Sequence, residues 1–364
     1  MPPLTLMVKP VSGLCNMQCR YCFYRDEMSR RETPLPAPMA YRTLENLVRR
    51  AMLRADGELN LIFQGGEPTL AGKDFYRQLL LLEKKYRRPD VTIRHAIQTN
   101  GLALDEAWCA IFREGGFLVG VSLDGTAALH DLNRRDRAGR LTAERVLESI
   151  ALLRREKIPY NILCVVTESM AAQAKQVFSA LREHAFLQFI PCMDGSAAEG
   201  FLQSRSYGQF LIDLFDCYEQ AYHSGKPVSI RTFDNWLAMA CGYPPESCAM
   251  SGRCSRATLI EADGSVYPCD FYAVDEWYLG NINDMSLPRL ERTEAAERFV
   301  QPLPLPEQCR ECPWLLLCRG GCRRDREPHP DSIGGVSCWC EGLKLFFDQR
   351  AERLHTLARS VYTS

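Results

Sequence analysis

The chain has 364 residues, of which 46% are hydrophobic and 24% charged, so a fibre or a disordered tail protein is excluded. Its 44 Lys and Arg residues balance 45 Asp and Glu residues, and this net charge of −1 provides no basic excess that would indicate nucleic-acid binding. No apolar run approaches the ~18 residues of a membrane-spanning helix, and the first residues lack the pattern of a signal peptide. We therefore expect a cytoplasmic protein without nucleic-acid or membrane partners.

Cysteine is unusually abundant. The chain contains 17 cysteines, an odd number, and carries no secretory signal. In a reducing compartment this favours metal or redox chemistry over a disulfide framework. Three cysteines lie within residues 15–22 and nine between residues 248 and 340, which predicts two metal-rich regions separated by an α/β body.

Up to about residue 225, short apolar runs alternate with helical patterns. Strands are expected at Leu4–Lys9, Leu59–Phe63, Val91–Gln98, Phe117–Leu123, Tyr160–Val166 and Phe186–Ile190. Helices are expected at Tyr41–Arg54, Asp74–Tyr86, Ala143–Lys157, Ser169–His184 and Tyr207–His223. Six β–α repeats predict a parallel sheet with right-handed crossovers, in a partial (β/α)6 TIM-like barrel. The functional residues are then expected at the carboxyl ends of the strands.

The composition changes after this region. From about residue 245, Cys, Gly and Pro punctuate segments too short to build a large core, which predicts a part that bound metal holds together. A closing helix is expected over Glu341–Tyr362. The predicted domains are residues 1–230, 231–340 and 341–364.

The first cysteine group, Cys15, Cys19 and Cys22, directly follows the first expected strand with C-x3-C-x2-C spacing. Three thiolates on one short loop suit a [4Fe–4S] cluster with one iron left open, which could hold and reduce a small chelating molecule. A zinc site is the alternative, although structural zinc normally has four protein ligands.

This spacing, with Tyr21 before the last cysteine, resembles the signature of the radical S-adenosylmethionine (SAM) enzymes. Gln64-Gly65-Gly66-Glu67-Pro68, after the second strand, looks like the family's GGEP motif, which receives the amino group of the cofactor. Glycines allow close backbone approach, and Glu67 could accept a hydrogen bond from an ammonium group. The resemblance implies a set of SAM-binding residues: Tyr21, Gly65, Gly66, Glu67, Asn100, Ser122 and Arg134.

The C-terminal cysteines resemble a SPASM domain, which carries two auxiliary [4Fe–4S] clusters in radical SAM enzymes that modify peptides. By this resemblance, one cluster would be held by Cys248, Cys254, Cys269 and Cys322, and the other by Cys309, Cys312, Cys318 and Cys340. Cys338 competes with Cys340 as the last ligand, and Cys340 is preferred because it directly precedes the closing helix. Full ligation by thiolates would suit these clusters to electron transfer. A pair of zinc sites is the alternative.

Within this group the chain most resembles the anaerobic sulfatase-maturating enzymes, in segments such as Cys22-Phe23-Tyr24 and Tyr267-Pro268-Cys269-Asp270. These enzymes oxidise one Cys or Ser of a sulfatase to Cα-formylglycine without oxygen. The resemblance implies that a 5′-deoxyadenosyl radical takes a hydrogen from the substrate Cβ, that Asp270 is the base, and that the auxiliary clusters accept the electron. Tyr24, Gln64 and Gln98 would line the substrate side. Without the resemblance, Asp270 would be read as a residue that caps a turn.

The implied partners are a sulfatase segment with the pattern Cys/Ser-x-Pro/Ala-x-Arg and an electron donor such as flavodoxin or ferredoxin. One rival is another SPASM maturase, which would form thioethers or carbon–carbon crosslinks on a ribosomal peptide. That rival predicts a leader-binding domain, and none is expected before Leu4. A second rival is an electron carrier or a zinc-stabilised binding module, for which the GGEP series would be superfluous. The patterns leave open whether the substrate residue is Cys or Ser.

Overall fold

The computed structural model describes residues 3–24, 38–193, 202–256, 258–327 and 335–362, and they form two compact units. The first unit consists of Met1–Ser122, Arg134–Tyr160 and Arg256–Val300. The second consists of Leu123–Asn133, Asn161–Ser255 and Gln301–Ser364. None of the described helices is both long and apolar enough to cross a membrane.

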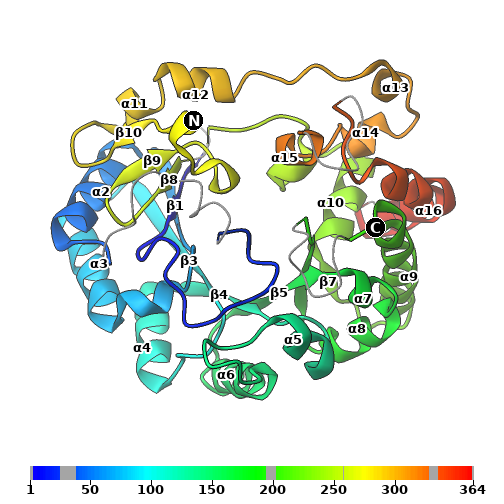
Figure 1. Cartoon of the computed structure of the whole chain (residues 1–364), viewed down its shortest axis with the longest axis horizontal. Helices are drawn as coiled ribbons and strands as arrows, with labels where there is room; N and C mark the ends of the chain where they lie inside the picture. The colour runs from blue at the N-terminus through cyan, green and yellow to red at the C-terminus, as the bar shows by residue number, and fades with distance from the viewer. Residues whose placement is uncertain (1–2, 25–37, 194–201, 257, 328–334, 363–364) are drawn as a thin grey trace. The chain divides into compact units, whose positions relative to one another are not determined.

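The first unit is built on parallel strands that alternate with helices. Its main elements are β1 (Leu4–Val8), α2 (Tyr41–Arg54), β2 (Gly57–Phe63), η1 (Pro68–Ala71), α3 (Lys73–Lys85), β3 (Val91–Thr99), α4 (Glu106–Gly115), β4 (Phe117–Ser122) and α6 (Ala143–Arg155). Figure 1 shows α2, α3 and α4 side by side along the strands. In α2 the buried positions Leu44, Leu47, Val48 and Ala51 recur every three or four residues, which gives the helix one apolar face for the sheet.

A later segment of the chain completes this sheet. It contains β8 (Thr258–Ile260), β9 (Ser265–Tyr267), η3 (Asp270–Tyr272), η4 (Asp275–Trp277), β10 (Gly280–Asn281), α11 (Leu287–Leu290) and α12 (Glu294–Phe299). β8 pairs in parallel with β1, so the strand order in this unit is β10-β9-β8-β1-β2-β3-β4. The first strand of the chain is therefore an interior strand.

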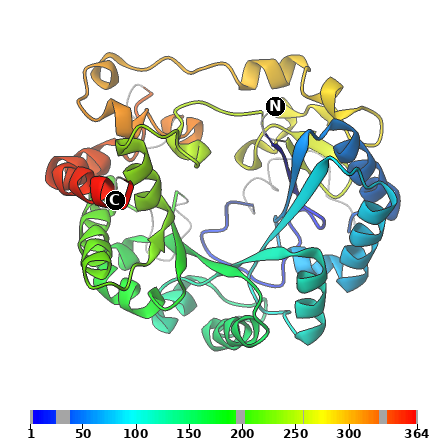
Figure 2. The same cartoon turned by 180° about the vertical axis from the view of Figure 1, so that it is seen from behind.

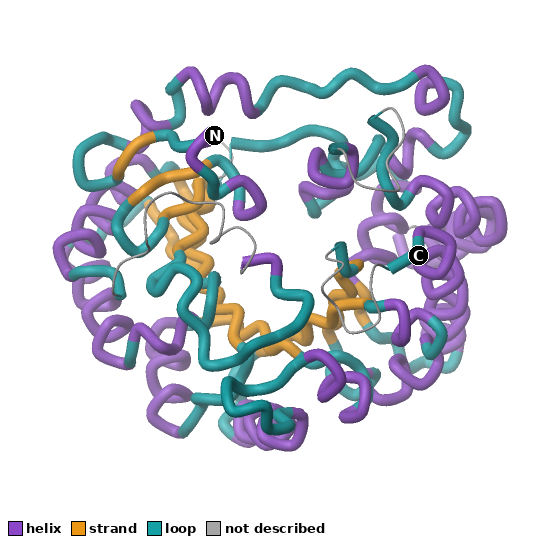
Figure 3. The backbone as a smooth tube through the Cα atoms, in the orientation of Figure 1, coloured by secondary structure: helices purple, strands orange, loops and turns teal. Residues whose placement is uncertain are grey.

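The register of the strands aligns their carboxyl ends. Val8 lies opposite Phe63 in β2 and Ile260 in β8, and Phe63 in turn lies opposite Ile97 in β3. Residues that directly follow these strands are consequently brought to one edge of the sheet. The segment from Lys9 to Cys22 leaves β1 at this edge, and Figure 3 shows most of it as loop.

The second unit contains a shorter set of strands and a long helical pair. Its elements are α5 (Ala127–Asn133), β5 (Tyr160–Val166), α7 (Glu168–Ala171), α8 (Ala174–Leu181), β6 (Phe186–Pro191), α9 (Ser204–His223), β7 (Ser229–Ile230), α10 (Arg231–Ala240), η2 (Cys248–Met250), α13 (Glu307–Arg310), α14 (Leu315–Cys318), α15 (Arg323–Arg326) and α16 (Cys340–Tyr362). Strands β5, β6 and β7 pair in parallel. Helices α9 and α16 run side by side, as Figure 2 also shows.

The two long helices approach closely at two glycines. A Cβ on Gly342 would lie 2.0 Å from the Ser204 carbonyl oxygen, and one on Gly208 would lie 2.5 Å from the Gly342 carbonyl oxygen. Glycine at both positions is thus what lets the closing helix pack on α9.

The α/β fold class with a parallel sheet is confirmed. One expected helix differs in detail: the stretch Ser169–His184 is divided into α7 and α8, because the helix is interrupted at Ala172 and Gln173. The structure also contains α4, α5 and α10, which we had not singled out. The predicted domain boundaries at residues 230 and 340 stay predictions.

Candidate functional site

The loop with Cys15, Cys19 and Cys22 is tied to a hairpin at residues 135–141. The Gln18 amide N–H donates to the Arg135 carbonyl at 2.9 Å, and the Arg137 amide N–H donates to the Asn16 carbonyl at 3.3 Å. The side-chain amide of Gln18 also donates to the carbonyl of Asp136 at 3.1 Å. The hairpin therefore fixes the backbone that carries the thiols.

Asp136 shapes this hairpin from inside. Its buried carboxylate accepts hydrogen bonds from the amide N–H groups of Ala138 and Arg140, both at 3.0 Å, and from the Arg140 side chain at 2.8 Å. The amide of Arg140 is the largest cause that holds the pKa of Asp136 below its ordinary value. An ionised carboxylate thus organises the support of the cysteine loop.

The three thiols are half-buried, and those of Cys15 and Cys22 are close enough for their charges to interact. Burial raises the pKa of the Cys15 thiol to about 11, and the charges of Glu67 and Cys22 act in the same direction, opposed by the Met17 amide. The protein alone therefore disfavours the thiolate form of Cys15. Bound metal ions supply the positive charge that deprotonates a thiol, so this environment is compatible with a metal-binding role.

The glycines of the 64–68 loop lie directly against the cysteine loop. The Gly66 amide donates to the Ser12 carbonyl at 2.7 Å, and the Glu67 amide donates to the Leu14 carbonyl at 2.8 Å. A Cβ on Gly66 would lie only 2.1 Å from the Leu14 carbonyl oxygen, so no side chain fits there. Gly65 has a φ of +119°, a value that favours glycine.

Glu67 is completely buried, and groups of the protein occupy its carboxylate. One oxygen accepts hydrogen bonds from the Thr69 hydroxyl at 2.6 Å and the Thr99 hydroxyl at 2.7 Å, and the other accepts from the Asn100 amide at 2.7 Å. Burial raises the pKa of Glu67, while these bonds oppose that effect. Glu67 thereby joins the loop after β2 to the loop after β3, and its bond to a cofactor ammonium stays a prediction.

Two further pairs of predicted site residues contact each other. The Gln98 side chain donates to the Ser122 hydroxyl at 3.1 Å, which links the ends of β3 and β4. The guanidinium of Arg134 lies 5.3 Å from the centre of the Tyr21 ring, and both residues are buried. The structure thus pairs Gln98 with Ser122 and Arg134 with Tyr21, and the role of these residues in binding the cofactor or the substrate stays a prediction.

A polar cluster surrounds Asp270, and we call Lys9, Tyr24, Gln64, Glu261 and Asp270 the Asp270 cluster. The Tyr24 hydroxyl donates to Asp270 Oδ2 at 2.5 Å, and the Gln64 amide donates to the same oxygen at 3.0 Å. The Lys9 ammonium lies 2.9 Å from Asp270 Oδ1 and 3.3 Å from Glu261 Oε1. It also lies 4.2 Å from the centre of the Tyr24 ring.

Two members of the Asp270 cluster were missed by sequence reasoning. Lys9 directly follows β1 and Glu261 directly follows β8, yet neither was singled out. Lys9 could have been found, because it is a charged residue at the end of an apolar strand. Gln64 was chosen for the same reason, since polar residues that follow parallel strands are candidate site residues. Glu261 was harder to find, since β8 has only three residues and was not expected as a strand.

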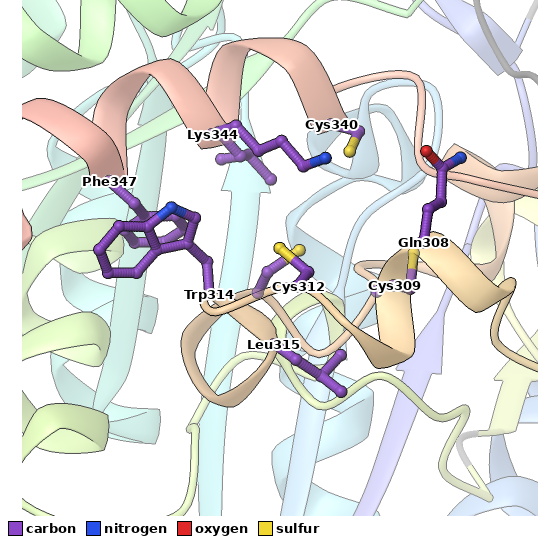
Figure 4. Close-up of a pocket in the computed structure, with 11 residues that line it drawn as sticks. Gln308, Cys309, Cys312, Trp314, Leu315, Cys340, Lys344 and Phe347 are labelled. Carbon is purple, nitrogen blue, oxygen red and sulfur yellow. The ribbon is translucent and has the colours of Figure 1, made fainter.

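In the second unit, one cavity is lined by Cys309, Cys312, Cys318 and Cys340. Figure 4 shows the sulfurs of Cys309, Cys312 and Cys340 around a common space, with Lys344 beside them. Burial raises the pKa of Cys318 to about 11, and the other three thiols add to this effect. Cys338, in contrast, is buried and is not among the residues that line the cavity.

A further group consists of Cys248, Cys254 and Cys322. Burial is the largest cause that raises the pKa of the Cys322 thiol to about 12. The charges of Asp325, Cys248 and Cys254 act in the same direction. The fourth predicted ligand, Cys269, belongs to the first unit, where it directly precedes η3.

Within the ranges that the structure describes, no three His, Cys, Asp or Glu side chains are gathered closely enough to hold a single metal ion. Zinc bonds of about 2.3 Å require sulfurs roughly 4 Å apart. A four-iron cluster takes one thiolate on each iron and spreads its ligands more widely. Cysteine thiols in groups are the donors that [4Fe–4S] clusters use, so the residues present fit such clusters.

The comparisons with known proteins agree with this geometry. Residues 10–172 match the radical SAM superfamily, and residues 248–313 match SPASM, an iron–sulfur cluster-binding domain. A Cysteine-type anaerobic sulfatase-maturating enzyme of Clostridium perfringens is 39% identical over 99% of this chain and 100% of its own length. A Serine-type enzyme of Klebsiella aerogenes is 33% identical over 99% of this chain and 88% of its own length.

A solved structure of native anSMEcpe with bound AdoMet and a Cp18Cys peptide superposes with a TM-score of 0.93. It is 38% identical in sequence, and the match covers 99% of this chain and 100% of that one. The fold, the cysteine groups and these matches define a radical SAM enzyme with a SPASM iron–sulfur domain. Similarity along the full length makes the assignment narrower: the chain belongs to the family of anaerobic sulfatase-maturating enzymes.

Proposed function

We propose that this enzyme converts a Cys or Ser residue of a sulfatase into Cα-formylglycine without oxygen. The observation that carries this proposal is the Asp270 cluster, which offers a carboxylate held by three polar side chains at the edge of the sheet that also carries the cysteine loop. A Cys-type and a Ser-type relative both match nearly the whole chain, which supports the reaction class but not one substrate residue over the other.

Cys15, Cys19 and Cys22 would hold the first [4Fe–4S] cluster and leave one iron for SAM. When bound, these groups would supply the radical chemistry that removes one Cβ hydrogen, with the auxiliary clusters as electron acceptors. The Gly65–Gly66 segment would receive the amino group of SAM through its backbone carbonyl oxygens, because an ammonium group donates hydrogen bonds. Ser122 and Arg134 would hold the carboxylate, with the guanidinium steadied over the Tyr21 ring.

Asp270 would take the proton from the substrate thiol or hydroxyl. Tyr24 and Gln64 orient its Oδ2, and Lys9 holds its Oδ1, so the carboxylate has one defined orientation. A positioned base of this kind contributes about 10²–10⁴-fold to a rate. Gln98 would line the substrate side near Ser122. A Ser substrate would give the aldehyde directly, whereas a Cys substrate would give a thioaldehyde that water converts to the aldehyde with release of hydrogen sulfide.

In the second unit, Cys309, Cys312, Cys318 and Cys340 would hold one auxiliary [4Fe–4S] cluster. The presence of Cys340 in their common cavity, and the burial of Cys338 elsewhere, support the choice of Cys340. Cys248, Cys254, Cys269 and Cys322 would hold the other. An electron donor such as flavodoxin or ferredoxin would reduce the enzyme.

The test is an anaerobic reaction of the reduced, cluster-loaded enzyme with SAM and a peptide containing Cys-x-Pro-x-Arg. The same peptide with Ser in place of Cys is run in parallel, and one with Ala serves as the control. We expect mass spectrometry to detect an aldehyde in the Cys or Ser peptide. With deuterium on the substrate Cβ, one deuteron should appear in 5′-deoxyadenosine. A thioether or carbon–carbon crosslink without aldehyde would favour the rival SPASM maturase.

A further inference from the structure

Asn100 contacts both the 64–68 loop and the first cysteine group. It directly follows β3, and only 8% of its surface is exposed. Its backbone N–H donates to the buried Glu67 carboxylate at 2.7 Å, which anchors the residue from one side. Because this hydrogen bond uses only the backbone, the Asn100 side chain can interact with the cysteine loop.

The orientation of the Asn100 amide is fixed by its neighbours. The side-chain oxygen accepts a hydrogen bond from the Leu102 amide N–H at 3.0 Å, so this end must be the carbonyl. The nitrogen then faces the cysteine loop, where it donates to the Asn16 side-chain oxygen at 2.7 Å and lies 3.7 Å from Cys15 Sγ. Because an amide nitrogen carries two hydrogens, both interactions can be made together.

The sulfur of Cys15 therefore receives N–H groups from two directions. One comes from the Met17 backbone at 3.3 Å, and the other from Asn100 at 3.7 Å. Each N–H group presents its positive end to the sulfur and stabilises negative charge on it. The same stabilisation applies to any extra negative charge that reaches this sulfur. Hydrogen bonds to the sulfurs are one of the factors that set the reduction potential of an iron–sulfur cluster.

We propose that the side chain of Asn100 raises the reduction potential of the first cluster by donating a hydrogen bond to Cys15 Sγ. Asn100 is in this sense a positioning residue that acts through Cys15, in addition to its predicted contact with SAM. The inference rests on the proposed function, which assigns Cys15 to a cluster. One electron added to the cluster increases the charge on its thiolates, so a nearby donor favours the reduced form.

The proposal is tested by the midpoint potential of the first cluster, measured by EPR-monitored titration without SAM. The signal of this cluster is identified as the one that is missing when Cys15, Cys19 and Cys22 are replaced by Ala. Asn100→Leu removes the donor and should lower the reduced-to-oxidised ratio about tenfold at a fixed solution potential, which equals about 59 mV for one electron. Asn100→Asp directs a carboxylate at the sulfur and should lower the ratio further.

Gln98→Leu is the matched control, because Gln98 lies at the same edge of the sheet and its side-chain amide donates to the Ser122 hydroxyl. Its midpoint potential should equal that of the parent chain. Equal potentials in the parent, Asn100→Leu and Asn100→Asp chains would overturn the inference, while the cluster assignment would stand. Absence of any four-iron signal dependent on Cys15, Cys19 and Cys22 would overturn both.

A second measurement can overturn the inference in the parent enzyme alone. In the reduced parent enzyme labelled with ¹⁵N in its Asn side chains, pulsed EPR should detect a nitrogen coupled to the first cluster. The coupling should be absent from the labelled Asn100→Leu chain. A parent spectrum without such a coupling would show that the amide does not reach the sulfur, and would overturn the inference even if the variants failed to fold.

Discussion

The Lys9 ammonium lies 2.9 Å from the Asp270 carboxylate, and the lysine side chain is only 2% exposed. Glu261, which is 1% exposed, lies on its other side at 3.3 Å. One cation is thus shared by two carboxylates in a region from which water is largely excluded. The arrangement stabilises the site only while all three charges remain, because a buried charge without a partner is strongly unfavourable.

We expect Lys9→Met to lower the free energy of unfolding by about 3–5 kcal/mol, the range for removal of one partner from a buried ion pair. Urea unfolding under anaerobic conditions measures the change. The double variant Lys9→Met/Glu261→Gln should recover part of this loss in unfolding free energy, since it removes one of the two carboxylates that Lys9→Met leaves without their cation. Lys73→Met is the control: Lys73 pairs with the half-exposed Asp105, and its loss should cost less than about 1 kcal/mol. Equal losses in the two single variants would contradict the argument.

Asp270→Asn tests the proposed base. The side chain hardly changes in size, so the fold and the cluster content should be retained. Formation of formylglycine should fall by about 10²–10⁴-fold, the usual range for a positioned base. Cleavage of SAM should continue at least in part, so deoxyadenosine would accumulate without a matching amount of aldehyde, as quantified by chromatography and mass spectrometry.

The control for this substitution is Asp263→Asn. Asp263 is exposed, and its carboxylate accepts hydrogen bonds from the amide and the hydroxyl of Ser265, both at 2.9 Å, so the yield of aldehyde per deoxyadenosine should match that of the parent. If Asp270→Asn also formed aldehyde at the parent rate, another group or water would have to take the proton.

The ligand assignment predicts the iron content of the loaded enzyme. Three [4Fe–4S] clusters correspond to about twelve irons per chain. Replacing Cys15, Cys19 and Cys22 by Ala should leave about eight irons and abolish deoxyadenosine formation, because the auxiliary ligands are separate from this loop. Iron analysis and chromatography measure the two effects. Stoichiometric zinc without iron after anaerobic purification, or full SAM cleavage by the triple variant, would disprove the assignment.

Gly66→Ala should weaken SAM binding by about 1–3 kcal/mol, the typical effect of overpacking. Its Cβ would meet the Leu14 carbonyl at 2.1 Å and push the 64–68 loop away from the cysteine loop. Gly225→Ala is the control, because that position has a φ of +70° but open space around it. The control should lose stability and retain SAM affinity, as measured by equilibrium binding. Unchanged affinity of Gly66→Ala for SAM would show that the 64–68 loop accommodates the added methyl group.

Asp136 gives a pH dependence with a defined sign. Its pKa is lowered in the folded chain, chiefly by the Arg140 amide, so its contribution to stability is full above the unfolded pKa of about 3.9 and is lost as the pH falls through the folded value. Asp136→Asn should therefore reduce the unfolding free energy at pH 7, and the difference from the parent should shrink in acid. Urea unfolding at several pH values tests this. A difference independent of pH would indicate that the carboxylate charge is irrelevant.

The strands, the cysteine loop and the polar residues after the strands could be predicted because their signals are local. An apolar run followed by Gln64 or Gln98 is visible in a few residues of sequence. The position of Asp270 could be proposed only through a family resemblance, since the residue itself reads as a turn cap. Glu261 could not be predicted, because its place depends on a three-residue strand that pairs with β1 across about 250 residues of chain.

The role of Glu67 was also out of reach of the sequence. The sequence predicts that Glu67 accepts a hydrogen bond from an ammonium group, whereas in the structure its buried carboxylate accepts from the hydroxyls of Thr69 and Thr99 and from the amide of Asn100. Nothing local in the sequence indicates that these donors converge. The link from Glu67 through Asn100 to Cys15 becomes apparent only when the loops after two strands are seen together.

The pairing of β1 with both β2 and β8 has a consequence for biosynthesis. The ribosome makes β1 first, but one edge of this strand stays unpaired until β8, Thr258–Ile260, has been synthesised. At about 5–20 residues per second, the delay is on the order of 10–50 s. During this time the nascent chain presents an open strand edge, a known route to aggregation, next to the three thiols of the cysteine loop. Iron delivered before β8 docks would therefore meet a site that still lacks Glu261 and Asp270.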